Sequence, residues 1–263
     1  MNTTKPIGVF DSGVGGTSIW KEIHELLPYE NTIYLADSQN APYGDKSVEE
    51  IISFSIKNTE LLLEMGCKII VVACNTATTN AISVLRQKYS IPFIGIEPAI
   101  KPAALQTLSK SIGVLATKGT LSSDLFSATS DEFTNGISKI EVIGKGLVPL
   151  IEEGKLDSPE LISLLKKYSK PMLEAAIDYL VLGCSHYPYL IPQLKKIIPK
   201  HIKIIDSGEA VAKQTKNILQ QNLLLKTETN PPKLQFYSNT TLKTMGLLLK
   251  DYSELITLEE RDF

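Results

Sequence analysis

The amino-acid sequence predicts an α/β protein built from two similar doubly wound domains with mainly parallel sheets. Short runs of β-branched residues, bounded by turn residues, alternate with longer segments of helical period, which is typical of βαβ units around a parallel sheet. The pattern then restarts, and segments similar to the first ones recur in the same order. These observations predict two similar halves, and if a pseudo-two-fold axis relates them, the halves can close over a cleft.

The first half alternates predicted strands and helices. Residues 17–27 carry Ile19, Ile23 and Leu26 at helical spacing, and residues 68–73 (KIIVVA) form an apolar run with the length of a buried strand. We expect strands at residues 7–10, 32–36, 68–73 and 93–96, and helices at residues 17–27, 48–65 and 76–88.

Three segments of the first half recur in the second half at an offset of about 110 residues. Their order and spacing are preserved, which is the expected mark of an internal repeat. The aligned pairs are residues 7–13 with 112–119, residues 70–76 with 180–186, and residues 91–99 with 202–210.

The end of the chain has no counterpart in the second half. From residue 211 onward the pattern predicts a helix, then a strand at residues 234–237 after the turn at 230–232, and a last helix at residues 242–252. We expect this segment to return and complete the first domain. The first domain would then consist of residues 1–97 and 213–263, and the second of residues 98–212.

Composition excludes several classes of protein. The chain has 263 residues, 43% of them hydrophobic, with 27 basic and 29 acidic residues and no basic cluster, so we expect no nucleic-acid partner. No apolar run approaches the roughly 20 residues that span a bilayer, and no signal peptide precedes the first strand, so we expect a cytoplasmic protein without membrane contact. Three cysteines form neither a disulfide framework nor a zinc motif, and we expect free thiols and no metal.

Two of the three cysteines occupy equivalent positions of the repeat. Cys74 and Cys184 each follow an apolar strand and precede a helix, at the sheet edge where open α/β proteins bind ligands and where a helix dipole favours thiolate. Cys67 begins a strand at the opposite edge, has no counterpart, and is interpreted as structural. If the halves close over a cleft, the two equivalent thiols approach one ligand from opposite sides.

Paired thiols of this kind favour a two-base reaction. A racemase or epimerase needs one acid/base group on each face of a carbon, and a free thiol with a pKa near 8.5 can be tuned to either role. A thiol hydrolase instead needs a nucleophile, a base and an oxyanion hole on one face.

The turn after the first strand allows two functional interpretations. Gly13 and Gly15 precede a helix, as in a dinucleotide-binding loop, but Ser18 replaces the third glycine and Asp11 would place a carboxylate beside a pyrophosphate. Alternatively, Asp11 lies near Cys74 and contacts a substrate ammonium or assists the thiol. A turn-forming role for Asp11 is also open.

Other polar residues lie close to the two thiols in the sequence. His186 follows Cys184 by two residues, and its imidazole could shuttle or tune the thiol proton. Glu152 could lie at the rim of the second domain, although the pattern around it is also that of a solvated glutamate.

Five blocks in order resemble the glutamate racemases of the cofactor-independent aspartate/glutamate racemase superfamily. The resemblance implies two pseudo-two-fold related α/β domains with the active site in the cleft between them, and a homodimer. It also implies interconversion of L- and D-glutamate without pyridoxal phosphate (PLP) or another cofactor, and supply of D-glutamate for peptidoglycan. The blocks are residues 8–16 (GVFDSGVGG), 41–44 (APYG), 73–77 (ACNTA), 147–152 (LVPLIE) and 182–188 (LGCSHYP).

The resemblance also implies residue roles by position. Cys74 would act on D-glutamate and Cys184 on L-glutamate, while Asp11 and His186 would assist the respective thiols, with Glu152 near the second. Substrate contacts would come from Asp11 and Ser12, Tyr43 and Gly44, Asn75 and Thr76, and Ser185 and His186. Ser185 stands where the family usually has threonine, which keeps the hydroxyl group.

Several other functions remain open from the sequence. An aspartate racemase shares the two cysteines, although the blocks are those of the glutamate enzymes. A cytoplasmic amino-acid binding protein shares the cleft but needs no thiols. A thiol phosphatase would need arginine six residues after its cysteine, where this chain has Asn80 and Leu190. Exchange of the glutamate Cα hydrogen in D₂O distinguishes the racemase from the others.

Overall fold

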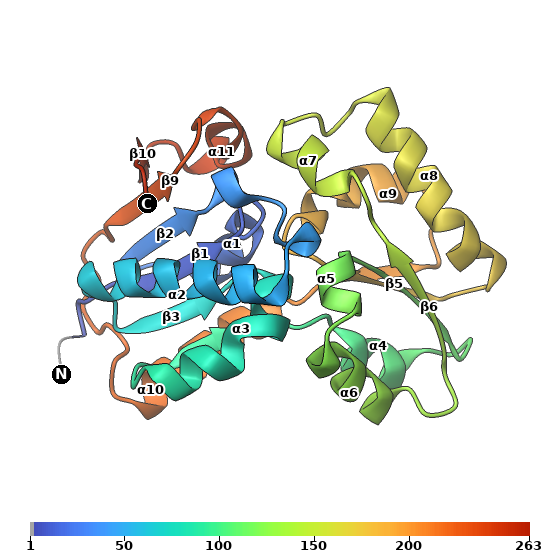
Figure 1. Ribbon diagram of the computed structural model, residues 1–263, viewed down its shortest axis with the longest axis horizontal. Coiled ribbons are helices and arrows are strands. Elements are labelled where there is room, and N and C mark those ends of the chain that lie inside the picture. The colour runs from blue at the N-terminus through green and yellow to red at the C-terminus, as the bar shows by residue number, and fades with distance from the viewer. Residues whose placement is uncertain (1–2) are drawn as a thin grey trace.

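The computed structural model describes residues 3–263 and contains two parallel sheets, each with helices on both faces, in two lobes that lie side by side (Figure 1). The predicted α/β fold class is confirmed. The N-terminal β-strands and the C-terminal segment share one lobe, and the middle of the chain forms the other.

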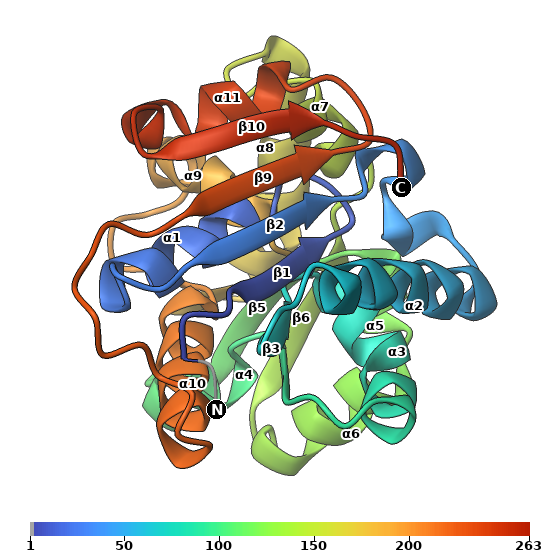
Figure 2. The ribbon, with the colours of Figure 1, turned by 90° about the vertical axis from the view of Figure 1, so that its left-hand side faces the viewer.

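The first sheet has six strands in the order β10–β9–β2–β1–β3–β4. Figure 2 shows this sheet face on. Every pairing in it is parallel, and β1 lies between β2 and β3. Its strands are β1 (Ile7–Asp11), β2 (Thr32–Ala36), β3 (Ile69–Val72), β4 (Phe93–Gly95), β9 (Leu234–Ser238) and β10 (Ile256–Glu260).

The second sheet repeats the central order of the first. Its order is β6–β5–β7–β8, which matches β2–β1–β3–β4 strand for strand. The predicted equivalence of residues 7–13 with 112–119, and of 70–76 with 180–186, therefore corresponds to β1 with β5 and β3 with β7. The strands are β5 (Ser111–Ala116), β6 (Ser138–Ile143), β7 (Tyr179–Gly183) and β8 (Lys203–Ile205).

Helices connect the strands in both lobes. Several begin at a residue whose side chain caps the first turn; Ser47, for example, forms a capping box with Glu50 at the start of α2. The helices are α1 (Thr17–Leu26), α2 (Val48–Glu64), α3 (Asn75–Lys88), α4 (Ile100–Gln106), α5 (Lys118–Leu121), α6 (Asp124–Phe133), α7 (Leu147–Glu152), α8 (Pro159–Glu174), α9 (Ile191–Ile197), α10 (Gly208–Gln221) and α11 (Lys243–Leu248). Short 3₁₀ turns lie at η1 (Ser38–Asn40), η2 (Tyr43–Asp45), η3 (Tyr187–Leu190) and η4 (Lys250–Tyr252).

Each sheet separates two hydrophobic cores. Alternate residues of one strand point to opposite faces, so Val9 packs with α1 and α10, whereas Phe10 packs with α2 and α3. In the second lobe, Leu182 packs with α7, α8 and α9, and Val181 packs with α4 and α6. Burial on both faces explains why these strands read as continuous apolar runs.

The end of the chain extends the first sheet. β9 pairs with β2, β10 pairs with β9, and α10 packs against α1. The predicted domain boundaries at residues 97 and 212 stay a prediction; α10 begins at Gly208, before the second of them. Among residues 3–263, no helix is both long enough and apolar enough to cross a membrane.

Two elements near the C-terminus differ from the sequence prediction. The single helix expected at residues 242–252 is divided into α11 and η4, and the Tyr252 ring at its end packs edge-on against Trp20. The strand β10 (ITLEE) was not predicted, because most of its side chains are exposed and its order comes from the ladder with β9.

Candidate active site

The carboxyl ends of β1, β3 and β7 meet at a small cavity between the lobes. Its volume is about 10 Å³, which is the space that one water molecule needs. Both equivalent thiols line it, and the lining residues are Ser12, Pro42, Tyr43, Gly44, Cys74, Asn75, Thr76, Thr117, Val148, Cys184, Ser185 and His186. The sequence placed nine of these in the site, and the structure brings all nine together.

Cys74 caps the first turn of α3. Its Sγ accepts a hydrogen bond from the Ala77 backbone N–H at 3.4 Å, which a helix N-terminus offers to an acceptor. Burial, followed by the negative charge of Asp11, raises the pKa of the Cys74 thiol above its ordinary value, while the Ser12 side chain acts in the opposite direction. At neutral pH these surroundings therefore hold Cys74 as a thiol.

Cys184 lies beside an imidazole. Its Sγ is 3.8 Å from His186 Nδ1, and both side chains are buried. Burial alone would lower the pKa of His186, but its contacts with Cys184 and Glu152 and the charge of Asp11 outweigh burial and raise that pKa well above its usual range. His186 is therefore a cation at neutral pH, and it can stabilise a thiolate on Cys184.

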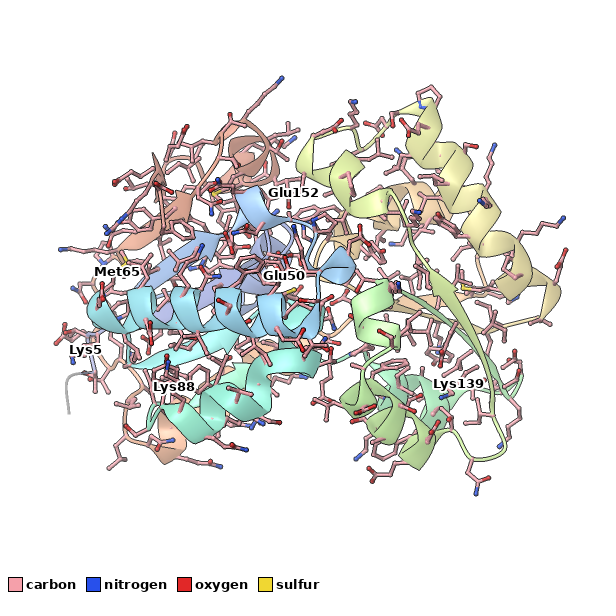
Figure 3. All side chains as sticks on the ribbon, in the orientation of Figure 1. Lys5, Glu50, Met65, Lys88, Lys139 and Glu152 are labelled. Atoms are coloured by element: carbon pink, nitrogen blue, oxygen red, sulfur yellow. The ribbon has the colours of Figure 1, made fainter. Side chains whose placement is uncertain are left out.

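Glu152 connects the lobes on one side of the cavity, where Figure 3 labels it at the top of their junction (Figure 3). Its Oε1 lies 2.5 Å from His186 Nε2 and accepts the Val14 backbone N–H at 2.8 Å, while Oε2 accepts the Ser38 hydroxyl at 2.9 Å. The sequence left two alternatives for Glu152, a residue of the site or a solvated glutamate on the surface. The side chain is only 16% exposed, and it fixes the orientation of the imidazole.

Asp11 is fully buried just behind the cavity. Its two oxygens accept the Gly16 backbone N–H at 2.8 Å and the Ser185 hydroxyl at 3.1 Å. Burial raises the pKa of this carboxyl, although the charge of His186 partly opposes the effect. Asp11 therefore contacts the second lobe through Ser185 while its charge acts on Cys74.

The glycine-rich turn after β1 is filled by the other lobe. A Cβ at Gly13 would lie 2.0 Å from Glu152 Oε1, and a Cβ at Gly15 would lie 2.2 Å from His186 Nδ1. These side chains occupy the place beside the turn that a pyrophosphate would need. The dinucleotide-loop interpretation is therefore wrong, and the glycines instead permit close approach of the lobes.

Asn75 has an unpaired side-chain amide. Only 2% of the residue is exposed, and neither its nitrogen nor its oxygen has a hydrogen-bond partner among the described residues. Buried polar groups are almost always satisfied. An amide left unpaired in the lining of a cavity indicates a ligand group that satisfies it.

The neighbouring predicted contacts are already engaged within the protein. The Tyr43 hydroxyl donates to Asp37 at 2.5 Å, so this hydroxyl is already engaged within the first lobe. The Thr76 hydroxyl lies 2.8 Å from the hydroxyl of Thr117, across the junction of the lobes.

The sequence prediction missed three lining residues, Pro42, Thr117 and Val148. The internal repeat contained the signal for Thr117, because the alignment of residues 7–13 with 112–119 places Ser12 opposite Thr117. Pro42 and Val148 belong to recognised blocks but have no polar atom to mark them. Cys67 lies outside the cavity, and burial raises its pKa to about 12.

Chemically, the cavity offers two thiols, one held neutral and the other beside a cation, in a space too small for bulk water. Such a pair can remove a proton from one side of a ligand and return it from the other. Within residues 3–263, no three His, Cys, Asp or Glu residues are placed to hold a metal ion.

Known proteins resemble this chain in sequence along most of its length. The profile of the Asp/Glu/hydantoin racemase family matches residues 7–215. Glutamate racemase from Ectopseudomonas mendocina is 48% identical over 230 residues, which cover 87% of this chain and 88% of the relative. Glutamate racemase from Roseiflexus sp. is 44% identical over 225 residues, covering 85% and 83%.

Solved structures resemble the whole fold. Glutamate racemase isoform RacE1 from Bacillus anthracis gives a TM-score of 0.88 at 32% identity and covers 100% of this chain and 99% of its own. Escherichia coli glutamate racemase in complex with L-glutamate and the activator UDP-MurNAc-Ala gives 0.86 at 30% identity and covers 98% of both chains.

Proposed function

The chain belongs to the Asp/Glu/hydantoin racemase family and is an isomerase of the glutamate racemase type, and from this premise we propose that Cys74 and Cys184 are its two catalytic bases. The observation that carries the proposal is that both thiols line one cavity from equivalent strand ends, after β3 and β7. Two related elements thereby present the same functional group to one ligand from opposite lobes.

In the proposed reaction the two cysteines exchange roles. With D-glutamate, the Cys74 thiolate removes the Cα proton and the Cys184 thiol donates its proton to the opposite face, giving L-glutamate and a Cys184 thiolate. The reverse reaction begins from the Cys184 thiolate. The number of protons on the pair is the same before and after each turnover, so each direction starts from the state in which the other ends.

The charged neighbours support these roles. We propose that the substrate ammonium compensates the negative charge of Asp11, which otherwise opposes a thiolate on Cys74. Protonated His186, oriented by Glu152, supports a thiolate on Cys184. The unpaired amide of Asn75 and the hydroxyls of Ser12 and Ser185 would bind the substrate carboxylates.

Closure of the lobes addresses the weak acidity of the Cα proton. A cavity the size of one water cannot admit glutamate, so the lobes must separate for binding and close again. Closure excludes water, and a dry site strengthens the hydrogen bonds that stabilise negative charge developing on the substrate.

The decisive experiment follows the Cα hydrogen. Each glutamate enantiomer is incubated with enzyme in D₂O without added PLP, and we expect exchange of the Cα hydrogen together with racemisation. Cys74→Ala and Cys184→Ala should abolish racemisation, whereas Cys67→Ala, the matched control outside the cavity, should retain it. Racemisation that survives either active-site substitution would refute the two-thiol mechanism.

We further propose that the product D-glutamate is used for peptidoglycan. The Escherichia coli relative was crystallised with an activator that contains N-acetylmuramic acid, a peptidoglycan sugar. Expression of this chain in a D-glutamate-requiring bacterium should restore growth without added D-glutamate. The Cys184→Ala variant should not restore it.

Two properties complete the proposal. All three cysteines are free, and unpaired thiols persist in a reducing compartment. We therefore propose a cytoplasmic enzyme, and fractionation of the native cells tests this location.

We also propose a homodimer, supported by the exposed side chains of Leu105 and Leu108 at the end of α4. Light scattering during gel filtration should then give about twice the chain mass of 28.9 kDa.

A further inference from the structure

Two larger pockets flank the closed cysteine cavity. The basic mouth, about 240 Å³, shares Pro42, Gly44, Thr117 and Val148 with the cavity and adds Lys118 and Lys145. The acidic mouth, about 200 Å³, shares only Pro42 and Val148 and adds Ser38, Glu152 and Glu153. Either could be the opening through which substrate reaches the thiols, and their charges and contacts differ.

The basic mouth carries unpaired positive charge. Lys118 and Lys145 are exposed and form no ion pair within residues 3–263, and Asp45 is the single carboxylate among the described lining residues. The charged lining residues of the acidic mouth are both carboxylates, with Glu153 paired to Lys155 and Glu152 to His186. A glutamate anion is attracted by the first arrangement and not by the second.

The lobes are also held together less strongly at the basic mouth. On the acidic side, the Glu152 carboxylate joins Val14, Ser38 and His186. On the basic side, the hydrogen bonds between the lobes all join neutral groups: the Thr76 hydroxyl lies near those of Thr117 and Thr120, and the Asn80 amide donates to the Gly119 carbonyl. Because hydrogen bonds to an ionised group are roughly twice as strong as neutral ones, separation at the basic mouth breaks the weaker kind of contact.

We propose that the basic mouth is the port through which glutamate reaches the two thiols, and that Lys118 and Lys145 raise the concentration of the anion there. The inference rests on the proposed function for the identity of the substrate. Lys118 is the first residue of α5 and Lys145 lies between β6 and α7, so both lysines belong to the second lobe, and they line the basic mouth together with Gly44 and Asp45 of the first.

The first test measures kinetics at low and high salt. In Lys118→Gln/Lys145→Gln we expect KM for both enantiomers to rise about three- to tenfold at low ionic strength, with kcat within about twofold, because the Debye length is then near 30 Å. At about 1 M salt, where that length is near 3 Å, the difference should disappear. The double variant Lys118→Glu/Lys145→Glu, which reverses both charges, should raise KM further at low salt.

A matched control separates local from general charge effects. Lys195→Gln/Lys200→Gln removes the same net charge from two exposed lysines that line another pocket, beside α9 and β8. This control should leave KM unchanged. An equal rise of KM in both double variants, or no rise in the first, overturns the proposal.

The second test does not depend on racemisation. Iodoacetate is an anion and iodoacetamide is neutral, and both alkylate cysteine thiolates. In a Cys67→Ala background, the substitutions Lys118→Gln/Lys145→Gln should lower the rate of alkylation by iodoacetate severalfold. The rate of alkylation by iodoacetamide should stay constant. If the enzyme fails to racemise glutamate, the proposed function fails; if the ratio of the two alkylation rates does not change, the port fails.

Discussion

Cys74 and Cys184 have equivalent positions in the two lobes but different neighbours. Cys74 lies within the field of a buried carboxylate, Asp11, while Cys184 lies 3.8 Å from an imidazole. A carboxylate opposes thiolate formation and an imidazolium favours it. The repeat thus supplies the symmetry that a two-sided reaction needs, and the neighbours give the two thiols different electrostatic surroundings.

This inequality predicts the effect of Asp11→Asn. Removal of the carboxylate charge should lower the pKa of Cys74, because that charge raises it in the native protein. The measurement is the pH dependence of iodoacetamide alkylation in a Cys67→Ala/Cys184→Ala background, where Cys74 is the single thiol. An alkylation curve that does not move toward lower pH would show that Asp11 exerts no charge effect on the thiol.

The unpaired amide of Asn75 predicts a separation of binding from stability. Asn75→Ala removes no hydrogen bond of the folded protein, so we expect the free energy of unfolding to change by less than about 1 kcal/mol. Loss of a charge-assisted bond to a substrate carboxylate should raise KM by about tenfold or more. Urea denaturation and steady-state kinetics on the same preparation test both parts, and unchanged KM would remove Asn75 from the binding site.

At the residue scale, the sequence predicted those site residues that lie in the internal repeat or in a recognised motif. The two thiols were found because one position occurs twice, and Cys67 was set aside for the opposite reason. The hydrogen bonds of Glu152 could not be predicted, since its partners Val14, Ser38 and His186 come from three separate segments that meet only when the lobes dock.

At the scale of elements, the turn between β1 and α1 is the point of closest approach between the lobes. Glycine without a side chain is required there because Glu152 and His186 fill the adjacent space. The same pattern of glycines suggested a nucleotide loop in the sequence. Local composition alone cannot distinguish a turn that approaches a phosphate from one that approaches another part of the chain.

The close approach predicts the outcome of Gly15→Ala. The new methyl group would lie 2.2 Å from the His186 ring, so the lobes should not close fully and kcat should fall by about a hundredfold or more. Gly246→Ala is a matched control, because its methyl group would lie 3.6 Å from the nearest atom and α11 should gain about 0.5–1 kcal/mol. Full activity in Gly15→Ala would contradict the closed arrangement as the reactive one.

Elements with strong apolar patterns were predicted well, and those ordered by their neighbours were not. β3 and β7 are buried on both faces; β3 lies within one residue of the predicted run at each end, and β7 begins one residue before its aligned run. β10 escaped prediction because an alternating, exposed strand has little apolar signal of its own.

At the scale of the whole molecule, the two lobes meet through ionisable groups. His186 of the second lobe contacts Glu152 and lies 3.9 Å from Asp11 of the first. The charge state of this junction therefore depends on pH, and closure is linked to the protonation of His186.

This linkage predicts how stability varies with pH. The folded protein raises the pKa of His186, so the stabilisation is complete below the unfolded value of about 6.5 and is lost as pH rises through the folded value. Wild-type free energy of unfolding should fall from about pH 6.5 upward relative to His186→Asn. Urea denaturation over a pH series measures both proteins, and parallel pH dependences would contradict the linkage.

The return of the chain to the first sheet also affects the order of folding during synthesis. All strands of the second sheet lie between Ser111 and Ile205, whereas β2 acquires its neighbour β9 only after Leu234–Ser238 has been made. On the ribosome, the middle of the protein can fold while the N-terminal strands still lack two partners. We expect the N-terminal lobe to finish folding last. Chaperones that bind unpaired strand edges should therefore act on this lobe.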